Sequence, residues 1–383
     1  MITKSPESKL PDIGTTIFTI MSQMSRDYNA INLAQGFPDF KCSDELVDLV
    51  TLYMKKGFNQ YAPMMGIHTL REKIALKSKE LYGANVNPDK EVTLTCGATE
   101  ACYTAITSIV KPGDEVIIFE PAFDCYIPAI QLSGGKPVFV ELQYPDYKID
   151  WELVRKKITG KTSLIIINSP HNPTGAIISK QDIKALTELT RDTDIILLSD
   201  EVYEHIIFDK AEHHSFLKYP ELQERSFVIS SFGKTYHTTG WRMGYCIAPE
   251  HLSAEFRKVH QYNTFSVPTP MQYAIADFLE KKEEYLGLPD FYQRKRDLFL
   301  NLMSGSRFKG IPSSGTYFQL MNFGDISEES DVDFAARLTR EFGVACIPIS
   351  VFYHTKKDDS IIRFCFAKED ETLEKAAKKL CRI

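Results

Sequence analysis

A lysine and an arginine mark the stretch of this sequence best suited to chemistry. Two serines and a glycine separate Lys234 from a hydrophobic run at 227–229. This pattern predicts that Lys234 lies where a strand ends and a tight loop begins. Arg242 comes eight positions later, between two nearby glycines. Lysine forms Schiff bases with carbonyl groups, and a serine such as Ser231, glycine-freed backbone and arginine bind phosphate. The pattern predicts a reactive amine beside an anion site.

Two simpler interpretations compete with this one. Most lysines are solvated surface charges, and a lysine without partners elsewhere in the chain would be one of them. Gly-Lys-Thr at 233–235 also looks like the end of a P-loop, but that motif requires a glycine at the position of Val228. The P-loop interpretation therefore fails, and the choice between a surface lysine and a reactive one depends on the rest of the chain.

The composition is that of an ordinary globular protein. The chain has 383 residues, of which 43% are hydrophobic and 25% charged, and its formal net charge is −6. We expect no nucleic-acid partner because no basic footprint is present, and no membrane span because no apolar run is long enough. Residues 1–9 lack an apolar signal core, so the cytoplasm is the expected location. The eight cysteines form no C-x-x-C pair and His213 and His214 are adjacent, so we expect reduced thiols and no metal site.

Short buried strands alternate with helices through the middle of the chain, which predicts an α/β fold. Strands are expected at 116–120, 138–142, 163–168, 195–199 and 227–230, with helices at 126–132, 151–158, 180–192 and 220–224. Apolar strands separated by helices are typical of a parallel sheet covered on both faces. Ligands of such sheets bind beyond the carboxyl ends of the strands.

The expected strand ends carry residues that could join Lys234 in one site. Asp200 closes a run of buried aliphatics, where a carboxylate is costly unless a cation or hydrogen-bond donors face it. It could be a helix cap or a salt-bridge partner, or it could face a protonated ring nitrogen. Asn172, in a turn-like segment, and Tyr203 could donate to an oxygen of the same ring, and Phe123 could supply a flat apolar surface. Convergence of several strand ends is more specific than any one of them.

Two glycine-containing loops could also approach a ligand. A strand at 91–95 runs into Cys-Gly-Ala-Thr-Glu and a helix, so Ala98 and Thr99 would lie at an anion-binding helix N-terminus. Gly36 precedes Phe-Pro in another loop, and its missing side chain would let backbone approach a ligand. Each pattern alone also fits an ordinary connecting turn.

A change of pattern near residue 287 predicts a second, smaller domain. Helices at 250–262 and 270–284 lead to Leu-Gly-Leu-Pro at 286–289, which breaks the helical pattern. Beyond this break, helices are expected at 290–303, 331–342 and 370–381, and strands at 317–321, 344–347 and 361–366. We expect a large domain over 31–286 and a small α+β domain formed by 1–30, with a short helix, together with 287–383.

Taken together, the motifs resemble those of class I pyridoxal-phosphate-dependent aminotransferases. Asn-Pro-Thr-Gly at 172–175, Asp-Glu-Val-Tyr at 200–203, Ser-Phe-Gly-Lys at 231–234 and Arg363 stand in the order and spacing of that family. The chain is most similar to the group of bacterial methionine aminotransferases and kynurenine aminotransferases (cysteine-conjugate β-lyases). The resemblance implies a fold-type I transferase, whose large domain has a mostly parallel seven-stranded sheet covered by helices, with a smaller α+β domain.

The resemblance also implies pyridoxal 5'-phosphate as cofactor and a role for each candidate residue. Lys234 would hold the cofactor covalently and later move the substrate proton. Asp200 would pair with the pyridinium nitrogen, Asn172 and Tyr203 would bind the ring oxygen, and Phe123 would stack on the ring. The phosphate would be held by Ala98, Thr99, Ser231, Arg242 and, from the neighbouring subunit of a homodimer with shared active sites, Tyr61. The position of Thr99 is often aromatic in the family, and a small hydroxyl here leaves it the phosphate role.

Substrate recognition is the other part of what the resemblance implies. Arg363 would bind the α-carboxylate of an amino acid, assisted by Asn172 and the Gly36 backbone. The side-chain pocket would be lined by Ile17, Phe18, Tyr61, Phe123 and, from the neighbour, Phe265 and Ser266. Such an apolar, aromatic pocket suits methionine and aromatic amino acids better than aspartate. The amino group would pass to a 2-oxo acid in a ping-pong reaction.

Two other functions stay open at this point. The same site acting on a substrate with a leaving group on Cβ would make the chain a cysteine-S-conjugate β-lyase, or its main donor could be kynurenine. A remote alternative is a non-catalytic regulatory protein that binds pyridoxal phosphate. Such proteins usually carry a DNA-binding segment, and the residues before Leu10 contain two separate lysines but no basic cluster. They also have little reason to keep Lys234, Asp200, Tyr203 and Arg363 together.

Overall fold

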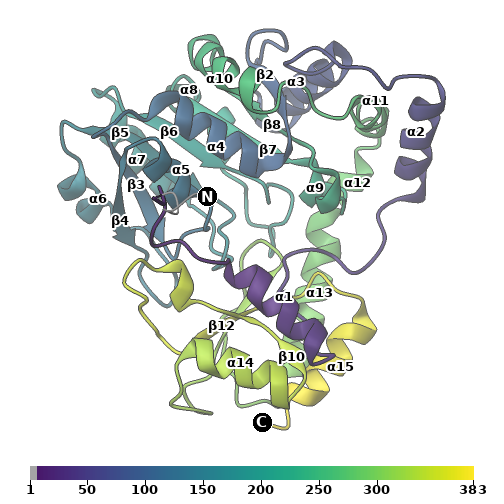
Figure 1. Cartoon of the computed structure of the whole chain (residues 1–383), viewed down its shortest axis with the longest axis vertical. Helices are drawn as coiled ribbons and strands as arrows, with labels where there is room; N and C mark the ends of the chain where they lie inside the picture. Colours follow the sequence, from purple (N-terminus) through teal and green to yellow (C-terminus); the bar gives the residue numbers. More distant parts are fainter. Residues whose placement is uncertain (1–6) are drawn as a thin grey trace, which may run out of the picture.

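The central sheet positions most of the candidate residues. The computed structural model describes residues 7–383, and its largest sheet has seven strands in the order β2-β8-β7-β6-β5-β3-β4 (Figure 1). These are β2 (Val92–Thr95), β3 (Glu115–Glu120), β4 (Lys136–Glu141), β5 (Thr162–Asn168), β6 (Ile196–Asp200), β7 (Ser226–Ser231) and β8 (Gly244–Ile247). β8 is antiparallel to both of its neighbours, and the other pairings are parallel. The expected α/β fold with a mostly parallel sheet is confirmed.

Helices cover both faces because successive strand residues point to opposite sides. In β3, Val116 and Ile118 belong to one buried cluster, whereas Ile117 and Phe119 belong to the other. The helices of this region are α3 (His68–Tyr82), α4 (Gly97–Ile109), α5 (Tyr126–Leu132), α6 (Trp151–Lys157), α7 (Lys180–Thr190), α8 (Pro220–Gln223), α9 (Phe232–Thr235), α10 (Glu250–Asn263), α11 (Thr269–Phe278) and α12 (Glu283–Leu286). α4 packs on β6, β7 and β8 and contacts α5 and α10.

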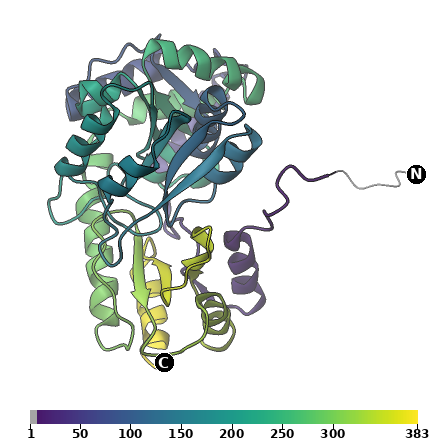
Figure 2. The ribbon, with the colours of Figure 1, turned by 90° about the vertical axis from the view of Figure 1, so that its left-hand side faces the viewer.

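The C-terminal elements form a separate layer, and α1 lies beside them although it is far away in the sequence (Figure 2). This part contains α1 (Ile17–Asp27), α13 (Leu288–Met303), β9 (Phe318–Asn322), α14 (Asp331–Glu341), β10 (Val344–Ala345), β11 (Ile347–Pro348), β12 (Ile361–Cys365) and α15 (Asp370–Leu380). β11, β12 and β9 form an antiparallel sheet. Arg363 lies on its central strand, so this sheet carries it into the interior.

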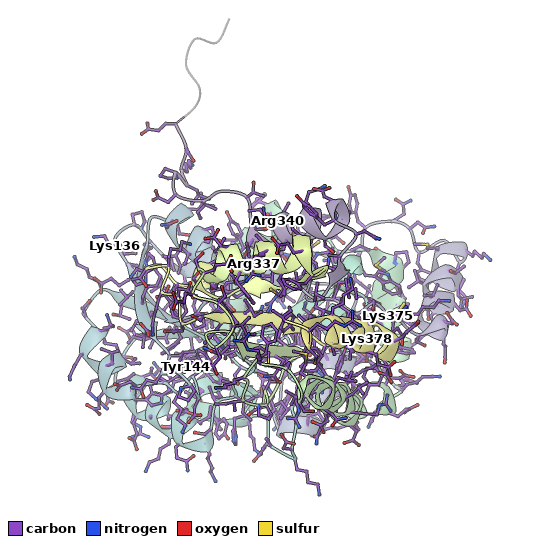
Figure 3. The ribbon with its side chains drawn as sticks, turned by 90° about the horizontal axis from the view of Figure 1, so that it is seen from below. Lys136, Tyr144, Arg337, Arg340, Lys375 and Lys378 are labelled. Atoms are coloured by element: carbon purple, nitrogen blue, oxygen red, sulfur yellow. The ribbon has the colours of Figure 1, made fainter. Side chains whose placement is uncertain are left out.

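Helical periodicity accounts for the outer helices of this layer. In α15, Leu373, Ala376 and Leu380 are buried, whereas Lys375 and Lys378 are exposed. Figure 3 shows this end of the molecule from below, with Arg337 and Arg340 of α14 and Lys375 and Lys378 of α15 labelled. α15 packs on α13 and also contacts β10.

Several elements differ from the sequence-based expectation. Helix α2 (Asp44–Lys55) was not expected. The helix expected at 270–284 is two helices, α11 and α12, joined by a short turn, and the strand expected at 344–347 is divided into β10 and β11. β1 (Ile31–Asn32) was not expected as a strand either, and its backbone pairs in parallel with the distant β10. Most other element ends agree within two residues.

The division into domains stays a prediction. The expected boundary at 286–289 coincides with the end of α12 and the start of α13, with Gly287 between them. At the other expected boundary, Ile31 and Asn32 pair with the C-terminal residues Val344 and Ala345. Their contacts therefore group these two residues with the smaller part of the molecule. Residues 1–6 of the expected small domain lie outside the described residues. No helix within 7–383 is both long and apolar enough to cross a membrane.

Candidate active site

Lys234 lies where β7 ends and the short helix α9 begins. Its Nζ donates to the Tyr317 hydroxyl at 3.0 Å and to the Gly36 carbonyl at 3.2 Å. Burial, together with the nearby Arg242 and Arg363 guanidinium groups, lowers the pKa of Lys234 to about 8. The amine is therefore neutral in a useful fraction of molecules near neutral pH, which is the state required of a nucleophile.

Asp200, at the carboxyl end of β6, is a buried carboxylate only 4% exposed. Its Oδ2 accepts a hydrogen bond of 2.6 Å from the Tyr126 hydroxyl, and its Oδ1 accepts one of 3.3 Å from the Val202 backbone. Burial raises the pKa of Asp200, while these donors and Lys234 act in the opposite direction. Within residues 7–383 no ion pair includes Asp200. Such a carboxylate is suited to a cationic group bound in the site.

Arg363 on β12 is fully buried and joins the C-terminal sheet to the central one. Its Nη1 donates to Asn172 Oδ1 at 2.6 Å, and its Nη2 donates to the Ala34 carbonyl at 3.1 Å. Among the described residues its Nε has no hydrogen-bond partner. The guanidinium lies 3.8 Å from the ring centre of Phe318, and burial lowers the pKa of Arg363 to about 10, which leaves it charged. A buried, charged fork with an unused donor can bind a carboxylate.

Asn168 holds two neighbouring strand ends together. Its Nδ2 donates to the Asp200 backbone carbonyl at 2.9 Å, and its Oδ1 accepts from the Asn172 backbone at 2.8 Å. Because Asn172 Oδ1 is already bound to Arg363, its amide NH2 is left to donate elsewhere. Sequence reasoning assigned a role to Asn172 but none to Asn168, although a polar residue closing an apolar strand was a usable signal.

The turn into α4 forms a cradle of backbone and guanidinium groups. Gly97, the first residue of α4, has φ +75°, and a Cβ added to it would lie 2.6 Å from Arg242 Nη2. A Cβ on Gly244 would lie 3.0 Å from the Ala98 nitrogen. Ser231 is the residue that precedes α9 in the same region. The helix N-terminus, the guanidinium and the hydroxyl are together suited to an anion such as phosphate.

Thr99, in the first turn of α4, is exposed, and Ala98 beside it is half-buried. Phe123 lies edge-to-face with Tyr126, at 6.0 Å between ring centres, and the Tyr126 hydroxyl in turn donates to Asp200. The ring of Phe18 lies 5.3 Å from the Arg363 guanidinium.

Tyr61 and Phe265 stand apart from this group. Tyr61 is 83% exposed and Phe265 is 45% exposed, and the two rings meet edge-to-face at 5.4 Å. Neither is a hydrogen-bond partner of Lys234 among the described residues. Gly36, in contrast, is in the site: its carbonyl accepts from Lys234 and, at 2.6 Å, from Tyr317, and a Cβ on it would lie 2.8 Å from Phe318.

Tyr126 and Tyr317 are two further site residues to which sequence reasoning assigned no role. Both are tyrosines in otherwise ordinary secondary structure, and their importance comes from contacts with Asp200 and Lys234 that are distant in sequence. Tyr203, which was expected, lies with its ring 5.5 Å below the Lys234 Nζ and edge-to-face with Tyr317. No group of His, Cys, Asp or Glu side chains in 7–383 is arranged to hold a metal ion.

The residues present fit a cofactor that combines a phosphate, a carbonyl and a protonated ring nitrogen. The amine of Lys234 matches the carbonyl, the Gly97–Arg242 cradle matches the phosphate, and the Asp200 carboxylate, which lacks a cation, matches the ring nitrogen. The unused Nε of Arg363 leaves a donor for a substrate carboxylate. These are the requirements of pyridoxal phosphate with an amino acid.

Comparison with known proteins identifies the family. The family described as aminotransferase class I and II matches residues 28–380, so this chain belongs to it, and the expected enzyme class is confirmed. A methionine aminotransferase of Escherichia coli is 49% identical over 379 residues, covering 99% of this chain and 98% of the relative. A kynurenine–oxoglutarate transaminase of Dictyostelium discoideum is 35% identical and covers 100% of this chain and 97% of its own length.

Solved structures agree with this assignment. A crystal structure from Escherichia coli, described as identifying a methionine aminotransferase function, has a TM-score of 0.97 at 48% identity and covers 99% of this chain and 100% of its own. An N-succinyldiaminopimelate aminotransferase from Mycobacterium tuberculosis has a TM-score of 0.95 at 33% identity, covering 99% of this chain and 100% of its own. The fold-type I architecture is therefore confirmed.

Proposed function

We propose that this protein is a pyridoxal-phosphate-dependent aminotransferase that takes the amino group of methionine or an aromatic amino acid and passes it to a 2-oxo acid. The observation that carries the proposal is the Arg363–Asn172 pair, which offers an unused Nε donor in the same site as Lys234, whose pKa is lowered to about 8. The similarity to a methionine aminotransferase supports the choice of donor.

The cofactor would be held by residues at several strand ends. Lys234 would bind it covalently, Asp200 would face its ring nitrogen, and Asn172 and Tyr203 would donate to its ring oxygen, with Phe123 against the ring. Its phosphate would be bound by Ala98, Thr99, Ser231 and Arg242. When bound, the cofactor supplies an electron sink that stabilises negative charge at the substrate Cα.

The protein's own groups supply positioning and proton transfer. Arg363 binds the substrate α-carboxylate in its planar fork, which orients the Cα–H bond toward Lys234. The Lys234 amine would serve as the base that accepts the substrate Cα proton and later gives it back. The covalent carriage of the amino group gives ping-pong kinetics.

Aromatic rings near Arg363 support an apolar donor. The rings of Phe18, Phe318 and Phe352 all lie within 5.9 Å of its guanidinium. A pocket of this kind separates substrates that differ by one methylene by only about 1–3 kcal/mol, so we expect broad specificity. Kynurenine is the second candidate donor, because a full-length relative carries that activity in its name.

The proposal includes a homodimer with shared sites in the cytoplasm. Tyr61 is 83% exposed and contacts Phe265 on the surface. This exposure supports a role in which Tyr61 binds the cofactor phosphate in the neighbouring subunit. Large and small domains over 31–286 and over 1–30 with 287–383 are part of the same proposal.

Initial rates with methionine, phenylalanine, kynurenine and aspartate, each with the same 2-oxo acid, test this function. We expect methionine and the aromatic donors to have the highest kcat/KM. Aspartate as the best donor would contradict the assignment. Release of pyruvate and ammonia from a cysteine S-conjugate without a 2-oxo acid would instead identify the β-lyase alternative.

A further inference from the structure

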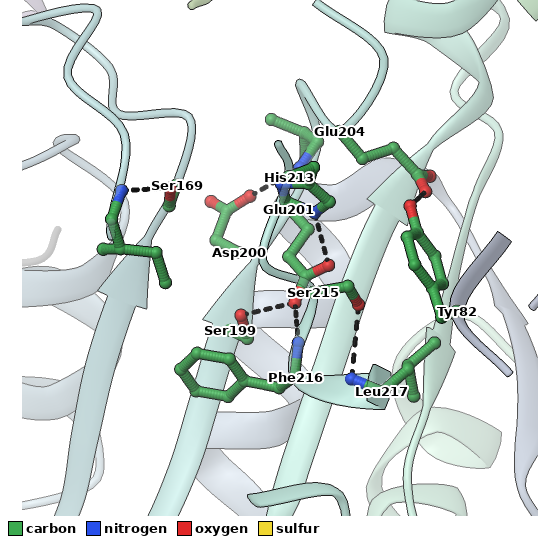
Figure 4. Close-up of polar contacts among 12 residues, drawn as sticks. Tyr82, Ser169, Ser199, Asp200, Glu201, Glu204, His213, Ser215, Phe216 and Leu217 are labelled. Atoms are coloured by element: carbon green, nitrogen blue, oxygen red, sulfur yellow. Dashed lines mark hydrogen bonds and ion pairs between the residues drawn. The ribbon is translucent and has the colours of Figure 1, made fainter. Parts of the chain in front are cut away.

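The segment after β6 sends its side chains in two directions. Asp200 and Tyr203 face the candidate site. Asp200 accepts a hydrogen bond from Tyr126, and the Tyr203 ring lies below the Lys234 amine. Glu201 and Glu204, from the same segment, are 2% and 7% exposed and make their contacts elsewhere in the interior (Figure 4). Two buried carboxylates that flank site residues require a specific reason, because each costs free energy unless it is fully paired.

Glu201 is bound by residues that are close to it in the sequence. Its Oε1 accepts from the Ser199 hydroxyl at 2.7 Å and from the Phe216 backbone at 3.0 Å, and His213 Nε2 lies 2.9 Å from its Oε2 (Figure 4). These partners are close in sequence to Glu201, so they shape the loop after β6 but do not link it to another part of the site.

Glu204, in contrast, is bound by distant elements. Its Oε1 accepts from Lys77 Nζ on α3 at 2.8 Å, and its Oε2 accepts from the Tyr82 hydroxyl at 2.5 Å. The Tyr245 hydroxyl on β8 completes the group, at 3.0 Å from Lys77 Nζ and 3.3 Å from Glu204 Oε1. Burial acts to raise the pKa of Glu204, but the charge of Lys77 outweighs it and holds this pKa well below its usual range. The pair is charged although it is inaccessible to water.

The position of this group relates two parts of the cofactor site. Glu204 is the residue after Tyr203, and Tyr245 is three residues after Arg242 on the other side of the group. The Tyr245 ring also packs on Phe232, at 5.1 Å between ring centres, at the start of the helix that carries Lys234. The Lys77–Glu204–Tyr245 group therefore joins the segment that donates to the ring and the segment that binds the phosphate.

We propose that Lys77 and Glu204 are positioning residues, whose buried ion pair fixes Tyr203 and Arg242 relative to each other so that the ring and phosphate of the cofactor are held in register. The inference rests on the proposed function. Stability alone is a poor reason for such a pair, because replacing a buried ion pair by neutral groups of similar shape is often neutral or stabilising. If both residues of the pair are replaced by neutral ones, we expect the protein to keep its fold, but Tyr203 and Arg242 to lose their fixed positions relative to each other.

The test compares two double variants, each of which replaces one lysine of α3 and its acidic partner. Lys77→Met/Glu204→Gln removes the buried charges and keeps an amide that the tyrosines can bind. Lys73→Met/Glu280→Gln removes the ion pair of 2.6 Å that α3 makes at the surface and serves as the matched control. For each protein we would measure the Tm, the Kd for pyridoxal phosphate by fluorescence quenching, the pH at which the bound cofactor's absorbance changes, and kcat and KM for methionine.

The buried variant is expected to fold with a Tm near that of the unchanged protein but to bind pyridoxal phosphate about tenfold more weakly. The absorbance transition should move to higher pH, since a displaced Tyr203 no longer donates to the ring oxygen. The other titratable and charged groups near Tyr203 are unchanged in this variant: Asp200, Lys234, Tyr317, Arg363 and Cys365. The kcat should fall at saturating cofactor while KM changes little, and the control should match the unchanged protein.

A buried variant that matches the control in Kd, absorbance transition and kcat would overturn the inference, as would a fall in Tm without any shift in the transition. If the double variant does not fold, Tyr82→Phe removes one donor to Glu204 and keeps both charges, and it must give smaller shifts in the same directions. Absence of cofactor binding by the unchanged protein would overturn the proposed function and the inference with it.

Discussion

Burial sets the chemistry of two cations in this site. Lys234 and Arg363 both have lowered pKa values, of about 8 and about 10, because each is removed from water. For the lysine this change creates a usable neutral amine, whereas the arginine stays charged at neutral pH. The same physical cause thus gives one residue a nucleophilic role and leaves the other an anion-binding role.

The lowered pKa of Lys234 predicts a pH dependence of cofactor attachment. Burial disfavours the protonated amine, so the neutral form dominates above pH 8, and the rate at which apoprotein couples to pyridoxal phosphate should rise with pH and level off above about pH 8. Stopped-flow absorbance over a pH series measures this rate. If the midpoint of the curve of rate against pH lies at the ordinary pKa of a lysine, the lowered pKa of Lys234 is contradicted. Lys234→Ala should show no attachment, while Lys73→Ala on the surface should behave as the unchanged protein.

Arg363→Lys should separate substrate binding from folding. Lysine keeps the charge but loses the planar fork and the contact with Phe318, and charged hydrogen bonds contribute about 1.5–3 kcal/mol each. We expect KM for methionine to rise about 10- to 100-fold. Steady-state kinetics give the result, with Arg340→Lys on the exposed face of α14 as the control. An unchanged KM would remove Arg363 from the substrate-binding role.

Sequence reasoning identified the unusual residues of the site and missed the ordinary ones. Asp200 could be found because a carboxylate that closes an apolar run has few structural explanations, and Lys234 because it follows a strand end beside residue types that bind anions. The role of Arg363 came from the family resemblance. Tyr126 and Tyr317 could not be found, because a tyrosine in a helix or beside a strand is common. Their roles depend on hydrogen bonds of 2.6 Å and 3.0 Å to segments far away in the chain.

At the scale of elements, the turn between β2 and α4 is the part most sensitive to a single methyl group. Gly97→Ala adds a Cβ that would lie 2.6 Å from Arg242 Nη2, and it places alanine at a φ of +75°. The left-handed backbone alone costs roughly 1–2 kcal/mol. We expect cofactor affinity to fall about tenfold or more, since Arg242 must move out of the phosphate cradle.

A second glycine separates the two effects of this change. Gly83 ends α3 with a φ of +72° and has nothing within 4 Å of an added Cβ, so Gly83→Ala carries the same backbone strain without displacing a side chain. Urea unfolding should give similar losses of stability for the two variants, whereas fluorescence titration with pyridoxal phosphate should show weaker binding only for Gly97→Ala. Equal affinities would show that Arg242 does not bind the phosphate.

Elements with their own periodicity were predictable, and elements defined by distant pairing were not. The ends of α5 agree with the expected helix at 126–132 because an apolar stripe and flanking turns define it locally. β1 has only two residues, and its backbone pairs with β10 more than 300 residues later, which no local pattern records. α2 is a different kind of miss: its buried Leu46 and Val50 follow helical spacing, and Asp44 and Glu45 occupy its first turn, so the signal was present.

At the scale of the whole molecule, the exposed Tyr61 predicts that active sites are shared between subunits. Lys234→Ala and Tyr61→Ala chains should each have low activity. When they are mixed, unfolded and refolded together, a heterodimer contains one site with an intact lysine and an intact tyrosine from opposite subunits. Random pairing of two chains gives about a quarter of full activity. Recovery measured by a methionine transamination assay supports shared sites, and activity no higher than the average of the two parents contradicts them.

The measurement that tests the central claim most directly is the absorbance spectrum of the protein with pyridoxal phosphate, before and after L-methionine is added without a 2-oxo acid. The account predicts a band of the bound cofactor that Lys234→Ala lacks, and its conversion by methionine to the shorter-wavelength aminated form. A bound-cofactor band that methionine does not change but another amino acid does would correct the substrate. No band from the unchanged protein with added cofactor would contradict the claim itself.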